Sequence, residues 1–255
     1  MKMLIETMKV DFKLQLRDFV VLFYSLIFPS LMLLIFGGMY GNLPSPFYGG
    51  FGTVDVMVPS FVGIVVAGNG IMNLPLTLVE YRDKKILKRL MATPLKPVYI
   101  IISQLVVNLI ITIIGFLIVA VFGKLIFNLH FYGNVLLFIV AFLISTLSIF
   151  SIGFLIASFI RNSRVATTVA NIIYFPMLFL SGATLPLETM PKFMLGIAKA
   201  VPLTYAVDLI KRTWLSSDIA WLDMGLSLSI DIFLLCAVTV VCFIISITQF
   251  KWYYD

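Results

Sequence analysis

Four asparagines inside long apolar runs are the first candidates for chemistry in this sequence. Asn69 and Asn73 are four residues apart, so a helix would place them on one face, where they would share a partner or line a path. Asn108 and Asn171 lie in two other apolar runs. In membrane helices such side chains mostly join helices, at about 0.6 kcal/mol each, and less often line a substrate path. The four are therefore candidates for a translocation path, with helix packing as the alternative.

Ionisable and nucleophilic residues give no catalytic or metal-binding pattern. Asp231 lies a few residues inside the last apolar run, where we expect it to reach the outer interface and anchor the helix rather than bind an ion. His130 is the single histidine, and no metal-ligand spacing surrounds it. Cys236 and Cys242 are six apart and point in different directions, so we expect inert thiols. The phosphate-binding G-x-x-x-x-G-K-[ST] and the nucleophile motif G-x-S-x-G do not occur. We expect no catalytic residue, metal or cofactor in this chain.

The composition requires a membrane around these residues. Of 255 residues, 61% are hydrophobic and 12% charged, and the mean hydropathy is +1.10. Soluble domains carry roughly a quarter charged residues. Several apolar runs reach the ~20 residues that cross a bilayer as a helix. The sequence predicts an all-α integral membrane protein with six transmembrane helices, near 20–40, 56–78, 98–122, 134–160, 165–185 and 227–247. Two prolines, Pro29 and Pro176, are expected to kink the first and fifth helices.

Positive charge predicts the orientation of the spans. Thirteen of the 18 Lys and Arg residues lie in one alternating set of flanking segments. Basic residues resist translocation, so this set is expected in the cytoplasm, with both termini and the 79–97 loop. The net charge of +6 sits beside apolar spans, where anionic lipid explains it, so we expect no nucleic acid partner. The expected location is a cell membrane, and the Lys- and Ile-rich composition indicates a bacterium.

Residues 1–19 form an amphipathic pattern before the first span. The apolar positions Leu4, Met8, Phe12, Leu16 and Phe19 recur every three or four residues, with charged residues between them. The pattern predicts a helix on the inner membrane surface, in contact with lipid. A frayed polar leader is the alternative.

The cytoplasmic loop 80–94 combines a run of charges with an apolar stripe. A solvated basic loop would explain the charges but not the stripe, and a stripe that faces the cytoplasm favours a groove on a partner protein. Thr93 and Pro94 end the short helix predicted there. The stripe consists of Ile86, Leu87, Leu90 and Met91, which are the candidate docking residues; Glu80, Arg89 and Thr93 join them through the family resemblance described below.

Residues 186–226 are too polar and too often broken by proline to cross the membrane. They contain two short apolar helical pieces, 193–201 and 203–214. Such pieces re-enter the membrane or cap its outer face when protein or water satisfies the broken backbone. An outer gate is one interpretation and an ordinary folded loop is the other. The candidate gate residues are Pro186, Glu188, Pro191, Pro202 and Tyr205.

Three stretches resemble one family, the ABC-2 type permeases, which are membrane subunits of ATP-binding-cassette transporters. They are FPSLMLLIFGGMYGN at 28–42, the loop 80–94, and LSGATLPLETMPKFMLGIAKAVPLTYAVDLIKRTW at 180–214. The resemblance covers nearly the whole chain, as one transmembrane domain. It implies that two subunits, identical or paralogous, form a twelve-helix exporter, and that loop 80–94 is the coupling helix that docks a separate cytoplasmic ATPase. ATP and Mg would be bound by that partner. It also implies that 1–19 is the interfacial helix and that 186–214 forms outer re-entrant helices.

Several functions stay open at the level of the sequence. The phenylalanine-rich spans favour export of an amphipathic or lipidic compound, such as a drug, a peptide antibiotic or a lipid-linked molecule, and hence efflux or antibiotic resistance. Sodium and polysaccharide exporters also occur in the family that the chain resembles. An ion-coupled carrier or channel would need buried charges and internal repeats, and neither is evident. A membrane enzyme or sensor would need a reactive cluster or a soluble domain.

Overall fold

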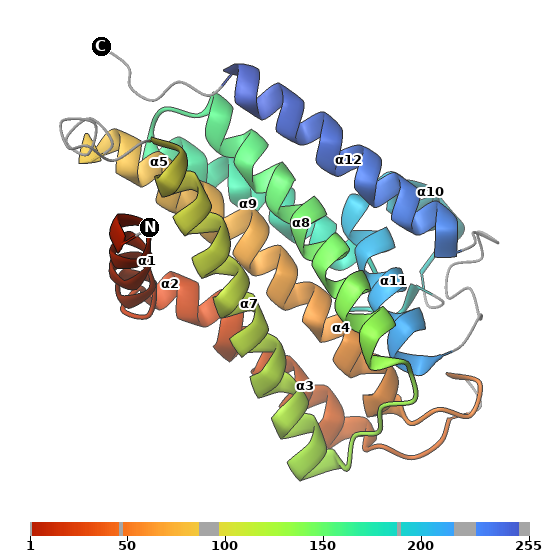
Figure 1. Ribbon diagram of the computed structural model, residues 1–255. Helices are drawn as coiled ribbons and strands as arrows, with labels where there is room; N and C mark the ends of the chain where they lie inside the picture. Colours follow the sequence, from red (N-terminus) through yellow and green to blue (C-terminus); the bar gives the residue numbers. More distant parts are fainter. Residues whose placement is uncertain (1, 46–47, 87–96, 188–189, 217–227, 250–255) are drawn as a thin grey trace.

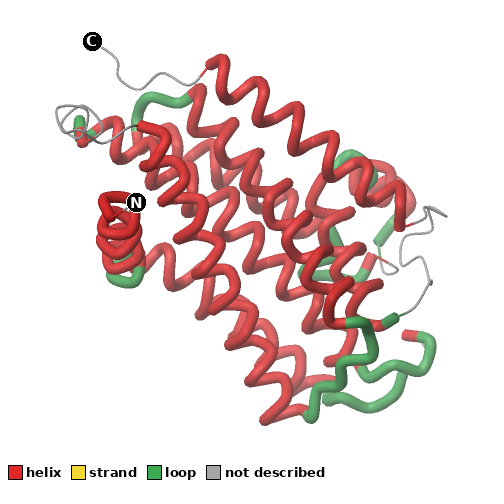
Figure 2. Tube along the Cα trace, in the orientation of Figure 1, coloured by secondary structure: helices red, strands yellow, loops and turns green. Residues whose placement is uncertain are grey.

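The computed structural model describes residues 2–45, 48–86, 97–187, 190–216 and 228–249. All regular secondary structure in these ranges is helical, and no strand occurs among them, as Figure 2 shows. The helices are α1 (Lys2–Gln15), α2 (Phe19–Leu22), α3 (Phe28–Tyr40), α4 (Thr53–Ala67), α5 (Leu74–Asp83), α7 (Pro97–Phe127), α8 (Val135–Phe159), α9 (Ser163–Leu180), α10 (Lys192–Ala198), α11 (Pro202–Leu215) and α12 (Leu228–Gln249), with π-helical segments η1 (Phe23–Ile27) and η3 (Gly68–Asn73).

Among the described residues, six helical stretches are long and apolar enough to span a membrane, which confirms the predicted number. They agree with the predicted spans to within about five residues at each end. They are Phe19–Tyr40, Thr53–Asp83, Tyr99–Phe127, Val135–Phe159, Ser163–Leu180 and Leu228–Gln249. A helix satisfies its own backbone hydrogen bonds, which lipid cannot do, so the apolar runs fold in this form.

The second span, formed by α4, η3 and α5, is the centre of the bundle. Nearly all of its side chains are buried, whereas at most half of those in each other span are. It runs behind α7 and α8 in Figure 1, with α3 and α9 beside it. The last span, α12, lies at the edge of the bundle and packs mainly on α8.

The helices α10 and α11 form the predicted re-entrant pair. Their axes are bent by 92° across a short break. Helix α11 is buried along almost its whole length, from Leu203 to Leu215, among α4, α8 and α12. The pair between the fifth and sixth spans is therefore confirmed, and α11 is a part of the core rather than a shallow cap.

Two prolines explain where the long helices are irregular. Each proline lacks an N–H, so the carbonyl four residues before it loses its helical partner. The segment η1 ends at Ile27, just before Phe28 and Pro29, and η3 ends at Asn73, just before Leu74 and Pro75. The expected irregularity near Pro29 is thus present as a π-helical turn, whereas α9 runs as one helix through Pro176.

The N-terminal helix α1 lies beside α7 and outside the main bundle (Figure 1). Its half-buried Met8 and Phe12 pack on Val21, Val107 and Ile111. The apolar face that the sequence assigned to lipid therefore packs in part on protein. The periodicity identified an apolar face correctly but could not specify what covers it.

Candidate functional site

Three buried side chains join the first and second spans near their middle. The Ser25 hydroxyl donates to Asn69 Oδ1 at 2.7 Å, and Asn73 Nδ2 donates to the same oxygen at 2.7 Å and to Ser25 Oγ at 3.1 Å. Ser25 lies in η1 and the two asparagines lie in η3, so both π-helical turns meet here. The two asparagines thus share a partner, as their spacing suggests, and both are fully enclosed by the protomer.

The other two asparagines lie apart from this pair. Asn108 is buried in α7 and donates to the Gln104 carbonyl of its own helix at 2.8 Å. Asn171, half-exposed in α9, donates to the Thr167 carbonyl at 2.9 Å. The four candidates for a translocation path therefore do not converge on one cavity within the described part of the protomer.

A buried group of charges lies where the re-entrant helix meets the last span. Arg212 Nε lies 2.7 Å from Asp208 Oδ2, one turn earlier on α11, and Arg212 Nη2 lies 4.0 Å from Asp231 Oδ2 on α12. All three side chains are at most 6% exposed. The Asp231 side chain is thus enclosed by protein, whereas its position in the sequence led us to expect that it reaches the outer interface. It anchors α12 by facing a guanidinium inside the bundle, because an unpaired buried carboxylate would be far more costly.

The candidate gate residues lie before α10 and at the start of α11. Pro191 precedes the first turn of α10, and Pro202 begins α11, where a missing N–H costs nothing. The Tyr205 hydroxyl donates back to the Lys199 carbonyl at 2.6 Å, which ties the two helices together. Pro186 lines a small open pocket between the start of α4 and α11. Glu188 lies outside the described residues.

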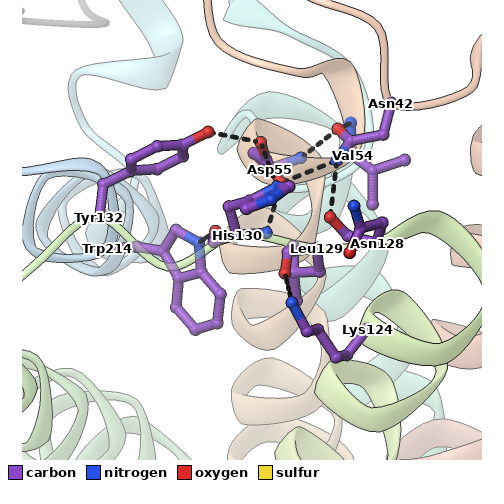
Figure 3. Close-up of polar contacts among 9 residues, drawn as sticks. All are labelled: Asn42, Val54, Asp55, Lys124, Asn128, Leu129, His130, Tyr132 and Trp214. Atoms are coloured by element: carbon purple, nitrogen blue, oxygen red, sulfur yellow. Dashed lines mark hydrogen bonds and ion pairs between the residues drawn. The ribbon is translucent and has the colours of Figure 1, made fainter.

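A third polar cluster, centred on Asp55, was not predicted from the sequence (Figure 3). Asp55 begins α4 and is almost fully buried; it accepts from Asn42 Nδ2 at 3.0 Å, from the His130 backbone amide at 2.9 Å and from the Tyr132 hydroxyl at 3.2 Å. Trp214 Nε1 donates to the His130 carbonyl at 3.2 Å. Burial and the Asp55 carboxylate raise the pKa of Tyr132. The cluster fixes the loop between α7 and α8 to the start of α4 and the end of α11.

At the opposite end of the bundle, Asp11 on α1 is buried against α5 and α7. It accepts from the Tyr81 hydroxyl at 2.7 Å and from the Ser103 hydroxyl at 2.5 Å. One turn away, Gln15 Nε2 donates to Gln104 Oε1 at 3.0 Å. Burial raises the pKa of Asp11, and the hydrogen bonds offset part of that effect. Polar contacts of Asp11 and Gln15 thus hold α1 in place. These two residues were not identified from the sequence.

Only the start of the predicted coupling segment is described. Glu80 forms an exposed ion pair with Lys84 one turn later, and Ile86 is half-buried. An exposed pair of this kind adds little stability. The other candidate docking residues, Leu87, Arg89, Leu90, Met91 and Thr93, lie outside the described residues.

Six spans, a buried re-entrant pair and internal polar clusters define a multi-pass helical membrane protein. The family model described as ABC-2 type transporter matches residues 4–214. The chain belongs to this family. The matched range includes the first five spans, loop 80–94 and the re-entrant pair.

Individual relatives are distant. The chain is 27% identical over 168 residues to the "Probable multidrug ABC transporter permease YbhR" of Escherichia coli (strain K12), an alignment that covers 65% of this chain and 46% of that protein. It is 25% identical over 225 residues to the "Putative transport permease ycf38" of Porphyra purpurea, covering 82% and 76%. It is 31% identical over 103 residues to "Nodulation protein J" of Rhizobium leguminosarum bv. viciae, covering 40% and 38%. The match thus spans about half the length of the E. coli relative.

Proposed function

We propose that this chain is the permease subunit of an ATP-driven exporter that moves an amphipathic or lipidic compound out of the cell. The observation that carries the proposal is the family match over residues 4–214, on a fold with all six spans. The name of the E. coli relative supports a multidrug type of substrate. The phenylalanine-rich spans, with 23 phenylalanines in the chain, favour an apolar surface along the path.

Energy would come from a separate cytoplasmic ATPase that docks on loop 80–94 and holds ATP and Mg. ATP binding can move the permease only if the docked ATPase contacts two arrangements of the helices differently. The apolar stripe that begins at Ile86 offers such a contact, and the end of α5 joins the stripe to the central span. No residue of this chain takes part in bond breaking in this proposal.

The assembly would contain two permease subunits, identical or paralogous, surrounded by membrane lipids. The distribution of Lys and Arg supports a cytoplasmic location for both termini and for loop 80–94. The Asp55 cluster and the re-entrant pair then lie on the outer side, where the pair would gate release of the compound. A bacterial plasma membrane is the proposed location.

The buried charges of Asp208, Arg212 and Asp231 favour the second candidate, an ion-coupled carrier, because such carriers hold ionisable groups within the membrane. Their mutual proximity favours a structural role instead. The two functions differ in their energy source, which is ATP for the exporter and an ion gradient for the carrier.

The test uses inside-out vesicles from cells that express the chain with the ATPase encoded beside it. Uptake of a fluorescent amphipathic dye or a fluorescent lipid is followed with ATP, and separately with an imposed proton or sodium gradient. The proposal expects uptake that needs ATP and survives ionophores. Uptake driven by a gradient in vesicles that lack the ATPase would establish the carrier instead, and Asp231→Asn would then be expected to abolish it.

A further inference from the structure

Three consecutive residues at the end of α5 each bind a different part of the protein. They are Tyr81, Arg82 and Asp83, which lie at the start of the coupling segment 80–94, where α5 ends. Tyr81 contacts α1, Arg82 contacts the end of α8, and Asp83 contacts the start of α9. Helix α5 also packs along both α8 and α9 (Figure 1).

Arg82 binds the last turn of α8. Its guanidinium, 6% exposed, donates from Nη2 to the Ala157 carbonyl at 2.9 Å and from Nη1 to the Ile160 carbonyl at 3.0 Å. The last four carbonyls of a helix have no partner within that helix, and they carry the negative end of its dipole. The Arg82 guanidinium carries a positive charge and donates two hydrogen bonds to these carbonyls, so it fixes both the distance and the orientation of α5 relative to the end of α8.

Asp83 binds the first turn of α9. Its Oδ2 accepts from the Ser163 backbone amide at 3.2 Å and from the Ser163 hydroxyl at 2.7 Å. The Asn162 side chain caps the same turn by accepting from the next amide, at 2.8 Å. A carboxylate at the positive end of a helix dipole has the favourable sign. Adjacent residues of opposite charge therefore hold both sides of the α8–α9 turn.

Tyr81 extends the connection to the N-terminal helix. Its hydroxyl donates to Asp11, whose other oxygen accepts from Ser103 near the start of α7. These groups are largely enclosed, so water competes little with the hydrogen bonds. A displacement of the end of α5 would thus be felt by α1, α7, α8 and α9 through polar contacts of fixed geometry.

We propose that Tyr81, Arg82 and Asp83 form a transmission joint that carries movement of the docked coupling segment into the spans. The joint rests on the proposed function, because it needs an ATPase that moves loop 80–94. Arg82 and Asp83 are positioning residues in it: they make the α8–α9 turn follow the end of α5. Without them, the end of α5 would lose the hydrogen bonds described above to the Ala157 and Ile160 carbonyls and to Ser163.

The mechanical part of the proposal is tested on the permease alone. Spin labels at Lys84→Cys and Thr167→Cys, with Cys236 and Cys242 changed to serine, report the distance between the end of α5 and the first turns of α9. A narrow distribution is expected in the parent. Arg82→Gln and Asp83→Ala should broaden it, whereas Arg164→Gln, an exposed change of charge on the same turn, should not. An unchanged distribution in both variants overturns the joint, whatever the ATPase does.

The coupling part uses the complex with the ATPase. Arg82→Gln and Asp83→Ala should still co-purify with the ATPase. Arg82→Gln should lose roughly ten- to hundred-fold in dye transported per ATP hydrolysed, the factor that a lost charge-assisted hydrogen bond represents. Asp83→Ala should lose less, because its bonds to Ser163 are exposed to water. Asp83→Asn keeps an oxygen that accepts from Ser163, so it should restore coupling. Full transport in both variants with docking retained overturns the proposal.

The two proposals fail in different ways. A parent protein that never binds the ATPase refutes the proposed function, and the joint as a transmission device is refuted with it. A parent that binds and transports, with Arg82→Gln and Asp83→Ala equally active, refutes the joint alone. Because Asp83 is exposed, Asp83→Ala is expected to fold. The test therefore remains decisive even if Arg82→Gln fails to fold.

Discussion

Replacing Gly153 by alanine is expected to separate α8 from the second span. A Cβ at Gly153 would lie 1.8 Å from the Gly70 carbonyl oxygen, 3.0 Å from its carbon and 3.2 Å from Pro75 Cδ. Close approach of two backbones at small residues is a common way to pack membrane helices. The obstructing atoms belong to the backbone and a proline ring, so no side chain can rotate away. The helices must therefore move apart until the oxygen is at least 3.0 Å away.

Two effects of opposite sign decide the result. Alanine in place of a helical glycine stabilises a helix by about 1 kcal/mol. Overpacking a filled interior costs roughly 1–3 kcal/mol, and this site is at the upper end of that range because backbone must move. The net expectation is a loss of about 1–2 kcal/mol. Gly38→Ala in α3 is the matched control, because nothing lies within 4 Å of the added carbon and only the helix gain applies.

The assay is thermal unfolding of the purified proteins in one mild detergent, followed by tryptophan fluorescence and by the monodisperse fraction after heating. Gly153→Ala should unfold at a lower temperature than the parent, and Gly38→Ala at the same or a higher temperature. Equal midpoints for the two alanine variants would refute the close packing of α8 on η3.

Four other substitutions test the polar clusters. Arg212→Met leaves the buried carboxylates of Asp208 and Asp231 without their guanidinium and should lower the free energy of unfolding by about 3–5 kcal/mol. Asp231→Asn should lower it less, because Arg212 still pairs with Asp208. Equal losses of thermal stability in the two variants would contradict the shared pairing. Burial raises the pKa of Asp11, so docking of α1 should be strongest below the ordinary aspartate value of about 3.9 and weaken as pH rises through the raised value. A fluorescent label on α1 should report this change between pH 4 and 8, and Asp11→Asn should remove it. Asn42→Ala removes the acceptor from the first amides of α4 and should cost about 1 kcal/mol in thermal unfolding, and no change would contradict the cap.

Hydropathy was sufficient to predict the spans because burial in lipid depends on composition over about 20 residues. It was less informative for α11, for which the sequence left open a re-entrant helix or a cap on the outer face. The i,i+4 spacing of Asp208 and Arg212 was visible in the sequence and is the signal that a buried pair leaves. Its burial depends on α4, α8 and α12, which no local pattern of α11 specifies.

The polar clusters were harder to predict because their members are distant in sequence. Asp55 meets His130 and Tyr132 across more than 70 residues, so neither position indicates the other. Asn69 and Asn73 were recognised as a pair because both lie on one helix, but their partner Ser25 belongs to another span. Local spacing thus predicts partners within an element, and packing decides the rest.

The central claim is that this chain works with a separate ATPase, and co-purification tests it most directly. The tagged chain and the ATPase encoded beside it are co-expressed and extracted in mild detergent, and their ratio and ATPase activity are measured. Leu87→Asp and Leu90→Asp place a charge on the predicted docking stripe, and Leu43→Asp places the same charge on an exposed leucine at the other end of the bundle. The account predicts equal amounts of the two proteins in the parent and in Leu43→Asp, and loss of the ATPase and its activity in the other two variants. A parent chain that purifies without the ATPase, or docking variants that retain it fully, would contradict the account.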